Sequence, residues 1–517
     1  MPHRAAPFRR HHILRPWWWC CHLLLLAATA WGAQESPAFV PDLTLKPDDV
    51  TVLMGVDARR PPELTPRYPS NHGKFFLVGW TNAEQVITWD ITVPSADDYL
   101  IQVVAERKSE QALEAEVTVG TTTQQATLPK TQKGWDRFPL PKPVHLTPGK
   151  VTISLRLRST DHQPFQAFVQ GLELVRPAVR EAQRAKALAQ RSDTTWFQQA
   201  RYGIFVHWTW QTKPRTGEPK PYAQAVADFD VPAFVAQMKD TGAGVVVLTT
   251  SHAYQSIPGP NRALDGILPG RTATRDLIGD LADALNKEGI RLMLYYHLGA
   301  TNDRAWQQAT GFFATDTTRF FANWEAIIRE VGERYGTRLA GWWFDDGSTN
   351  YYYRSPPWER LAAAAKAGNP QRIIGFNPWT VFSPTEFQDF YCGETNQDPA
   401  SVGGLLTPSG TGRYPSGPLS GLQGSACFTL DGTDWVHGAK NQEIRPTRFK
   451  PERLAAMLTK FIERKNVPLL NLEIYQEGTV SPATVEVFRQ ARALMAAAPK
   501  APRPAAGAGS PVPPPSK

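Results

Sequence analysis

Residues 339–347 read Leu-Ala-Gly-Trp-Trp-Phe-Asp-Asp-Gly, a short apolar run that ends in two carboxylates and a glycine. The run is too short and too aromatic for a typical helix, so it predicts a buried strand whose C-terminal end opens into a polar site. Side chains alternate faces along a strand, so Trp343 and Asp345 share one face and Asp346 lies on the other. The two aspartates also fit a simple turn, in which carboxylates accept hydrogen bonds from backbone N–H groups.

Alternating strand and helix patterns surround this run from residue 194 to residue 497. The predicted strands are 203–208, 244–250, 291–298, 372–376 and 467–474, and the predicted helices are 231–241, 274–288, 317–335, 356–367, 453–464 and 483–497. This alternation predicts a parallel sheet with right-handed crossovers, and so many units predict a closed (β/α)8 TIM-like barrel. Residues 383–445 break the rhythm and are expected to form functional loops around the short strands 387–391 and 426–430.

A different pattern precedes this α/β region. Between residues 41 and 176, short β-type runs are separated by turn residues, and residues 87–91 and 113–117 alternate apolar and polar side chains. We therefore predict an all-β sandwich, followed by a linker helix over 177–193. The sandwich resembles the carbohydrate-binding modules of exported polysaccharide enzymes, although a structural spacer fits the pattern equally well.

The two ends of the chain have compositions of their own. Residues 1–33 hold four arginines, then a short apolar run, then small residues, which predicts a signal peptide cleaved between Ala30 and Gln34 and a secreted or periplasmic protein. An uncleaved anchor is the alternative, but the apolar run is shorter than the roughly 20 residues that span a bilayer. Residues 498–517 are rich in Pro, Ala, Gly and Ser, so we expect them to be disordered.

The formal charge of +8 does not indicate a nucleic-acid partner. The positive surplus lies mostly in the predicted signal and in the tail, which leaves the region between them nearly neutral. Outside the predicted signal the cysteines are Cys392 and Cys427, which could form one disulfide or stay free and buried. Neither lies in a Cys or His spacing typical of a structural metal site.

Five predicted strands end in side chains that can hold a sugar or move a proton. They are His207-Trp208, Ser251-His252, Tyr295-Tyr296-His297, Asp345-Asp346, and Asn377 with Trp379. Sugars present C–H faces that stack on aromatic rings and hydroxyls that need donors and acceptors, and these residue types supply both. A metal site is the competing interpretation of the histidines and aspartates. It leaves the aromatic residues unexplained and lacks a paired histidine spacing, so we expect no metal and no cofactor.

Five motifs in this region resemble those of the α-L-fucosidases of glycoside hydrolase family 29. Residues 196–208 contain Trp-Phe and Arg-Tyr-Gly-Ile-Phe-Val-His-Trp, which is similar to the first barrel strand of that family. The other four are Leu-Thr-Thr-Ser-His at 248–252, Arg-Asp-Leu at 275–277, Trp-Phe-Asp at 343–345, and Lys-Asn-Val-Pro-Leu-Leu-Asn-Leu at 465–472 with Glu-Gly-Thr-Val at 477–480. All five occur in the order of the family.

The resemblance implies a retaining mechanism, in which Asp345 attacks the anomeric carbon and a second carboxyl group protonates the leaving oxygen. It also implies that His207, His252 and Trp208 hold the sugar. The full set of expected substrate contacts is His207, Trp208, His252, Tyr296, His297, Trp343, Asp346, Trp379 and Trp435.

The chain departs from the family pattern at three places near these residues, and one of them is Thr209, which follows Trp208 where the family has Gly. Ala253, Tyr254 and Gln255 stand where the family has His, Asp and Gly, and Gly424-Ser425 stands where it has the Trp-Glu that supplies the acid. We therefore assign the acid to Glu394, which closely follows a predicted strand. The alternatives are Asp431, Asp434, Glu443 and His437.

The sequence predicts an exported retaining glycoside hydrolase that acts on fucose-containing oligo- or polysaccharides. Two other hypotheses stay open at this point. One is a carbohydrate-binding protein on a catalytically degraded barrel, and the other is an endo-acting hydrolase whose long loops at 383–445 form a cleft.

Overall fold

The computed structural model describes residues 42–67, 76–107, 112–129, 136–161, 163–299, 302–314, 316–345, 356–377, 383–395, 406–408, 410–416, 419–432 and 434–497. The predicted signal peptide, the predicted C-terminal tail, Asp346 and Trp379 lie outside these residues. None of the helices in the described ranges is both long enough and apolar enough to cross a bilayer.

The N-terminal region consists of two antiparallel sheets. One has the order β2 (Thr65–Arg67), β3 (Phe76–Trp80), β11 (Ala167–Val175), β5 (Asp97–Arg107), β8 (Asp136–Pro139), with β1 (Thr51–Met54) paired to β11 and β9 (Val144–Leu146) paired to β5. The other has the order β4 (Val86–Val93), β10 (Gly149–Ser159), β6 (Leu113–Val119), β7 (Thr122–Leu128). A short 3-10 helix, η1 (Gly55–Asp57), follows β1.

Alternating side chains of both sheets share one hydrophobic core. In β6, every second residue from Leu113 to Val119 is buried, as the polar and apolar alternation predicts. The core joins Trp89 and Ile153 of one sheet to Val103 and Leu172 of the other. The two sheets therefore pack face to face as a β-sandwich.

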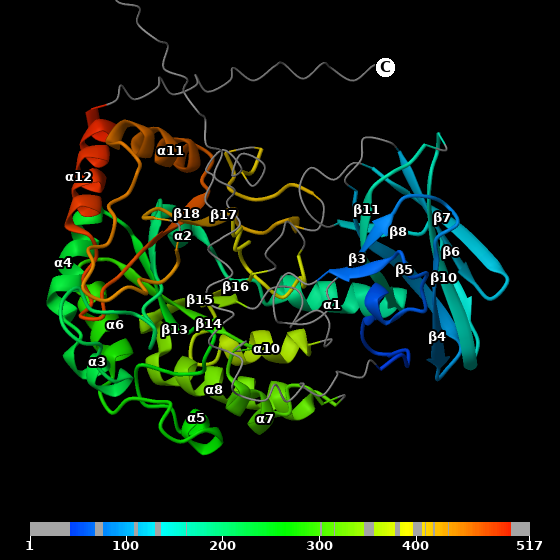
Figure 1. Ribbon diagram of the computed structural model, residues 1–517, viewed down its shortest axis with the longest axis horizontal. Helices are drawn as coiled ribbons and strands as arrows, with labels where there is room; N and C mark the ends of the chain where they lie inside the picture. Colours follow the sequence, from blue (N-terminus) through cyan, green and yellow to red (C-terminus); the bar gives the residue numbers. More distant parts are fainter. Residues whose placement is uncertain are drawn as a thin grey trace, which may run out of the picture. The chain divides into compact units, whose positions relative to one another are not determined.

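The C-terminal region contains a seven-stranded parallel sheet (Figure 1). Its order is β16 (Ile373–Phe376), β15 (Leu339–Asp345), β14 (Arg291–His297), β13 (Val245–Ser251), β12 (Gly203–Val206), β18 (Val467–Leu472), β17 (Ser425–Thr429). The helices are α1 (Pro177–Ala189), α2 (Thr195–Gln199), α3 (Tyr222–Asp228), α4 (Val231–Thr241), α5 (Arg262–Ile267), α6 (Leu277–Lys287), α7 (Arg304–Thr310), α8 (Thr318–Tyr335), η2 (Gly336–Arg338), α10 (Trp358–Ala365), α11 (Pro451–Glu463) and α12 (Pro482–Ala497).

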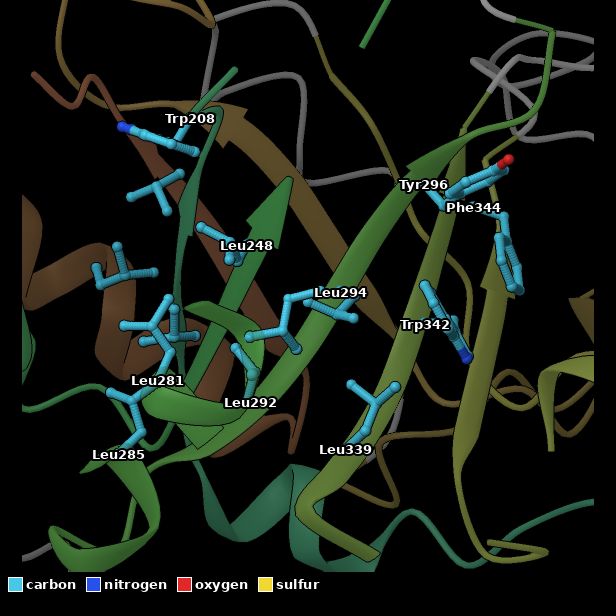
Figure 2. Close-up of a cluster of buried hydrophobic side chains, with 14 of the residues drawn as sticks. Trp208, Leu248, Leu281, Leu285, Leu292, Leu294, Tyr296, Leu339, Trp342 and Phe344 are labelled. Carbon is cyan, nitrogen blue, oxygen red and sulfur yellow. The ribbon is translucent and has the colours of Figure 1, made fainter. Parts of the chain in front are cut away.

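The two faces of this sheet bury separate cores. The outer core packs strand residues such as Leu248 and Trp342 against helix residues such as Leu281, and Figure 2 shows part of it. The inner core gathers residues from all seven strands, including Phe205 of β12 and Trp343 of β15. Those two rings meet edge to face, with centroids 5.4 Å apart, although two strands separate them in the sheet. The sheet is therefore strongly curled around the inner core.

Residues 389–395 hydrogen-bond to both edge strands of the curled sheet. The N–H of Asp389 donates to the carbonyl of Ile374 on β16 at 2.8 Å, and the N–H of Cys427 on β17 donates to the carbonyl of Gly393 at 3.0 Å. Gly393 has φ +62°, and an added Cβ would lie 2.2 Å from the carbonyl oxygen of Ser425. This left-handed residue interrupts the extended backbone. The described residues therefore show seven strands and a paired segment, where the sequence predicted a closed barrel of eight.

Arg372 stands immediately before β16 and is fully buried. Its guanidinium donates to five backbone carbonyls, those of Gly332, Gly336, Leu339, Ala365 and Ala367, at 2.6 to 3.0 Å. Four of these carbonyls lie at or near the C-terminal ends of α8 and α10, where a helix carries unpaired acceptors and partial negative charge, and the fifth, that of Leu339, lies at the start of β15. Burial lowers the pKa of Arg372 to about 10, which leaves it charged at neutral pH. Arg372 thus fixes the start of β16 against two helices.

Replacing Arg372 by methionine should lower the free energy of unfolding by about 3 kcal/mol or more, because several buried carbonyls lose their donors at once. Urea unfolding followed by fluorescence measures the change. The matched control is Arg360→Met, which removes a largely exposed guanidinium paired with Glu325 and should cost less than about 1 kcal/mol. Equal losses in the two variants would show that Arg372 does not anchor the helix ends.

Candidate functional site

Asp345 ends β15 on the inner face of the sheet, with 8% of its surface exposed. The Tyr295 hydroxyl donates to Oδ2 at 2.5 Å, and the amide of Asn377 donates to Oδ1 at 2.8 Å. Burial alone raises the pKa of this carboxyl. The positive charge of His297 and the hydrogen bonds from Tyr295 and Asn377 outweigh that effect and leave the pKa below its ordinary value. Asp345 is therefore ionised at neutral pH.

Glu394 lies beside Asp345. It belongs to the segment between β16 and β17, and its backbone forms an isolated parallel β-bridge with that of Cys427 on β17. The amide nitrogen of Asn377 donates to Oε2 of Glu394 as well as to Asp345. Burial, and then the negative charge of Asp345, raise the pKa of Glu394 to about 8. Glu394 is therefore mostly protonated at pH 7.

One nitrogen that donates to both carboxyl groups sets the distance between them. Two hydrogen bonds on a single atom hold the accepting oxygens within roughly 6 Å of each other. Two like charges at that separation in a poorly solvated site disfavour double ionisation, so one group keeps its proton. The site thus holds an ionised carboxylate, Asp345, next to a carboxylic acid, Glu394.

Three histidines line the same face of the sheet. His207 and His252 directly follow β12 and β13, and His297 is the last residue of β14. The ring centroid of His252 lies 5.5 Å from that of His207 and 5.8 Å from that of His297. Burial lowers the pKa of His207 to about 3 and lowers that of His252 as well, so both are neutral at pH 7. The structure therefore brings together the three histidines that the sequence predicted for this site.

Asn471, near the end of β18, fixes the tautomer of His207. Its Nδ2 donates to the carbonyl of Trp435 at 3.1 Å, so its Oδ1 is the atom that faces Nδ1 of His207 at 2.7 Å. That oxygen can only accept, which places the ring proton of His207 on Nδ1. Nε2 of His207 is then an acceptor, and it has no hydrogen-bond partner within the described ranges.

Two predicted tryptophans lie close to this group. The ring of Trp435, in the loop after β17, lies 5.2 Å from that of His207. Trp343, on the same face of β15 as Asp345, stacks on Tyr295 at 5.3 Å and belongs to the buried inner core. Trp435 therefore sits beside the polar groups, whereas Trp343 packs one layer deeper and supports Tyr295.

Two residues of the predicted set, Trp208 and Tyr296, face the outer core and do not join this group. Trp208 is fully buried and donates its indole N–H to the carbonyl of Gln476 at 3.0 Å, and Tyr296 packs near Trp324. Both belong to the cluster between strands and helices, and Figure 2 shows them there. Each is adjacent in sequence to a histidine of the group described above, but alternation turns it to the opposite face. Asp346 and Trp379 lie outside the described residues.

The list of expected substrate contacts omitted Tyr295, Asn377 and Asn471, although Tyr295 and Asn377 were among the side chains noted at the strand ends. Tyr295 pairs in register with Trp343, and His297 pairs with Asp345, so these four side chains point inward together. The signal for Tyr295 was present in the sequence, since Tyr295 and His297 are two residues apart and share a face. Asn377 follows β16 directly, at the same end of the sheet as Asp345.

The alternative acids have other surroundings. Asp431 is buried and accepts from the Thr484 hydroxyl at 2.7 Å, while Asp434 is exposed. Glu443 pairs with Arg215 on the surface, and His437 contacts Glu473 at 3.1 Å. Of the five acid candidates, Glu394 is the one that shares a hydrogen-bond donor with Asp345.

The cysteines and the polar clusters also bear on the predicted chemistry. Cys392 and Cys427 are free and buried in the inner core, so of the two alternatives the free pair is confirmed. Burial raises the pKa of both thiols well above the ordinary value, which leaves them unreactive at neutral pH. The described residues contain no group of three or more His, Cys, Asp or Glu side chains arranged to hold a metal ion.

Comparison with known proteins finds matches to alpha-L-fucosidases. The family model described as alpha-L-fucosidase matches residues 220–497, more than half of the chain. Tissue alpha-L-fucosidase of Bos taurus is 31% identical over 148 residues, which cover 22% of this chain and 31% of that protein. The Homo sapiens protein is 28% identical over 170 residues, which cover 26% of this chain and 35% of that protein. The aligned regions thus span about a third of these relatives.

Solved structures of the same kind also match. The alpha-L-fucosidase AlfC from Lactobacillus casei, in complex with alpha-L-fucose, aligns with 18% identity and a TM-score of 0.41 over 59% of this chain and 98% of that one. A GH29 alpha-L-fucosidase from Bacteroides thetaiotaomicron, trapped as a covalent intermediate, aligns with 15% identity and a TM-score of 0.41, and the alignment covers 58% of this chain and 74% of that chain.

Replacing Glu394 by glutamine should make stability less sensitive to pH. The native carboxyl keeps a proton up to about pH 8, whereas the unfolded chain releases it near pH 4.5. This group therefore makes wild-type stability fall as pH rises through that window. The melting temperature of Glu394→Gln, relative to that of the wild type, should increase between pH 5 and pH 8. Below pH 5 this difference should not change with pH.

The matched control is Asp434→Asn, which changes an exposed carboxylate in the nearby loop. Its melting temperature should follow the wild type at every pH. A Glu394→Gln curve that is parallel to the wild type would mean that Glu394 titrates normally.

Proposed function

Because the chain belongs to the alpha-L-fucosidase family, we propose that it is a glycoside hydrolase that cleaves α-L-fucosyl bonds. One observation carries the proposal, namely the pair of carboxyl groups on the amide of Asn377. Glycoside hydrolysis needs one carboxylate and one carboxylic acid on opposite sides of the same bond, and Asp345 and Glu394 hold these two states.

The separation of the two groups favours retention of configuration. Retaining enzymes place their carboxyl groups about 5 to 5.5 Å apart, whereas inverting enzymes need about 6.5 to 9.5 Å to admit a water molecule. A shared hydrogen-bond donor is compatible with the shorter distance. We therefore infer a double displacement through a covalent glycosyl-enzyme.

In the first step, an oxygen of Asp345 bonds to the anomeric carbon as the bond to the leaving oxygen breaks. Glu394 gives its proton to that oxygen, and the leaving group departs as an alcohol. In the second step, Glu394 takes a proton from water, and the resulting hydroxyl displaces Asp345 from the anomeric carbon. Both carboxyl groups return to their starting states.

The remaining side chains of the site supply contacts for a sugar. Nε2 of His207 accepts from a sugar hydroxyl, because its tautomer leaves a lone pair there. His252 and His297 add donors and acceptors, and the Trp435 ring offers an apolar face beside His207. A complete site of this kind favours a working enzyme over a protein that only binds carbohydrate.

The wider setting of the site is also part of the proposal. We infer that residues 389–395 take the eighth position of a (β/α)8 barrel, supported by their hydrogen bonds to both edge strands. The composition of residues 1–33 supports export of the protein. We also infer that the N-terminal sandwich binds a fucose-containing glycan.

Replacing Asp345 by alanine should reduce hydrolysis of an aryl α-L-fucoside by about 1,000-fold or more, because the covalent step loses its nucleophile. Added azide should restore turnover and release β-L-fucosyl azide, which NMR identifies. Glu394→Ala should instead give the α-azide, because its nucleophile remains. An active Asp345→Ala enzyme without azide would rule out this mechanism.

Replacing Tyr295 by phenylalanine should move the acidic limb of kcat/KM to higher pH. The Tyr295 hydroxyl lowers the pKa of Asp345, so its removal raises that pKa, and the nucleophile ionises later as pH increases. The neighbouring variant Tyr296→Phe is the matched control, since it removes a hydroxyl on the opposite face of β14. If both variants keep the wild-type pH profile, Tyr295 does not tune the nucleophile.

A further inference from the structure

A pair of aromatic rings lies near the ends of β12 and β13. Trp210 is 38% exposed and is one of three exposed large hydrophobic residues in the described ranges. Its ring meets that of Tyr254 edge to face, with centroids 4.6 Å apart and an interplanar angle of 76°. An exposed indole of this kind presents one apolar face to solvent.

The pair stands directly beyond two residues of the site. Trp210 follows His207 by three positions, and Tyr254 follows His252 by two. Because β12 and β13 are adjacent parallel strands, the segments that leave them emerge side by side at the end where Asp345 lies. The two rings therefore form part of the rim of the site.

Both rings are carried by well-fixed turns. Before and after Trp210, the N–H of Thr209 donates to the Thr212 hydroxyl at 2.8 Å and the N–H of Thr212 donates to the carbonyl of Thr209 at 3.0 Å. Before Tyr254, Ala253 has φ +61°, a left-handed conformation that a non-glycine residue adopts at a cost.

Hydrogen bonds hold the turn that carries Tyr254. The N–H of Asn302 donates to the carbonyl of Ala253 at 3.1 Å, and the N–H of Gln255 donates to Oδ2 of Asp303 at 3.0 Å. Arg271 in turn pairs with Asp303 at 2.9 Å. The backbone conformation at Ala253 and the hydrogen bonds of Ala253 and Gln255 thus fix the position of Tyr254.

We propose that Trp210 and Tyr254 form an aromatic platform that binds a second sugar ring, next to the residue held at Asp345. The C–H face of a pyranose packs on the exposed indole, and the Tyr254 ring holds that indole in place. The family pattern has an aspartate where this chain has Tyr254, so the platform is a feature of this chain. The proposal rests on the proposed function and names its substrate class as oligosaccharides with a terminal fucosyl residue, over simple fucosides.

The test compares two kinds of substrate, one without and one with a sugar in the leaving group. α-L-Fucosyl fluoride has no sugar in its leaving group, whereas 2′-fucosyllactose, 3-fucosyllactose and α-L-fucosyl-(1→6)-N-acetylglucosamine do. For the best of these three, Trp210→Ala should lower kcat/KM by about 10-fold or more, with most of the change in KM, while the value for the fluoride should stay within about two-fold. A ten-fold loss corresponds to about 1.4 kcal/mol, which is within reach of one buried ring face.

Three further variants complete the design. Trp210→Phe keeps an aromatic face and should recover most of the oligosaccharide rate, and Tyr254→Ala should reproduce part of the loss. Leu494→Ala truncates another exposed hydrophobic residue, which is 42% exposed on α12. Its kcat/KM for the oligosaccharide and for the fluoride should equal those of the wild type. Equal melting temperatures for all variants establish that they fold.

The outcomes separate the two proposals. A wild type that leaves α-L-fucosyl fluoride intact overturns the proposed function and this inference with it. A wild type that cleaves the fluoride, together with a Trp210→Ala enzyme whose ratio between oligosaccharide and fluoride is unchanged, keeps the function and overturns the platform. Calorimetric titration of the same oligosaccharide into Asp345→Asn should show a loss of affinity of about 10-fold when Trp210→Ala is added, and an unchanged affinity would overturn the platform.

Discussion

The proposed chemistry of this protein depends on a single side-chain amide that donates hydrogen bonds to two carboxyl groups. Asn377 donates to both Asp345 and Glu394, which holds two groups that repel each other when ionised at a short separation. The surroundings resolve this conflict unequally. Asp345 has the Tyr295 hydroxyl and the nearby charge of His297 to stabilise its anion. Among the described residues, the hydrogen bond that offsets burial at Glu394 is that of Asn377. The proton therefore stays on Glu394.

The scaffold keeps that geometry by fixing β16 at both ends. Arg372 binds five carbonyls before the strand starts, and Asn377 follows where it stops. The segment that carries Glu394 is held in turn by Asp389, whose carboxylate accepts from the N–H of Ile374 at 2.9 Å and pairs with Lys366. A small shift of either element would move one carboxyl group away from the shared amide.

Much of this arrangement could be predicted from the sequence. The strand that ends in Asp345, the strand and helix alternation and the inward histidines are confirmed, because strand ends with polar residues are distinctive. Glu394 was chosen for its place after a short strand pattern, and the structure sets it beside Asp345.

Other features could not be predicted, for physical reasons. The strands of the curled sheet are buried on both faces, so hydrophobic alternation does not tell inward from outward. Trp208 and Tyr296 were included beside His207 and His297, although their side chains belong to the outer core. The carbonyls bound by Arg372 come from residues 332 to 367, a set that no local motif reveals. Gly393 interrupts segment 389–395 through a backbone angle that propensity alone does not specify.

The most direct test of the account is mass spectrometry of the protein after treatment with 2-deoxy-2-fluoro-α-L-fucosyl fluoride. The fluorine at carbon 2 slows hydrolysis of the glycosyl-enzyme, while the fluoride leaving group lets it form. If Asp345 is the nucleophile, the protein should gain one fluorofucosyl mass per molecule, and peptide mapping should place it on Asp345. An unlabelled protein that still cleaves fucosides, or a label on Glu394, would contradict it.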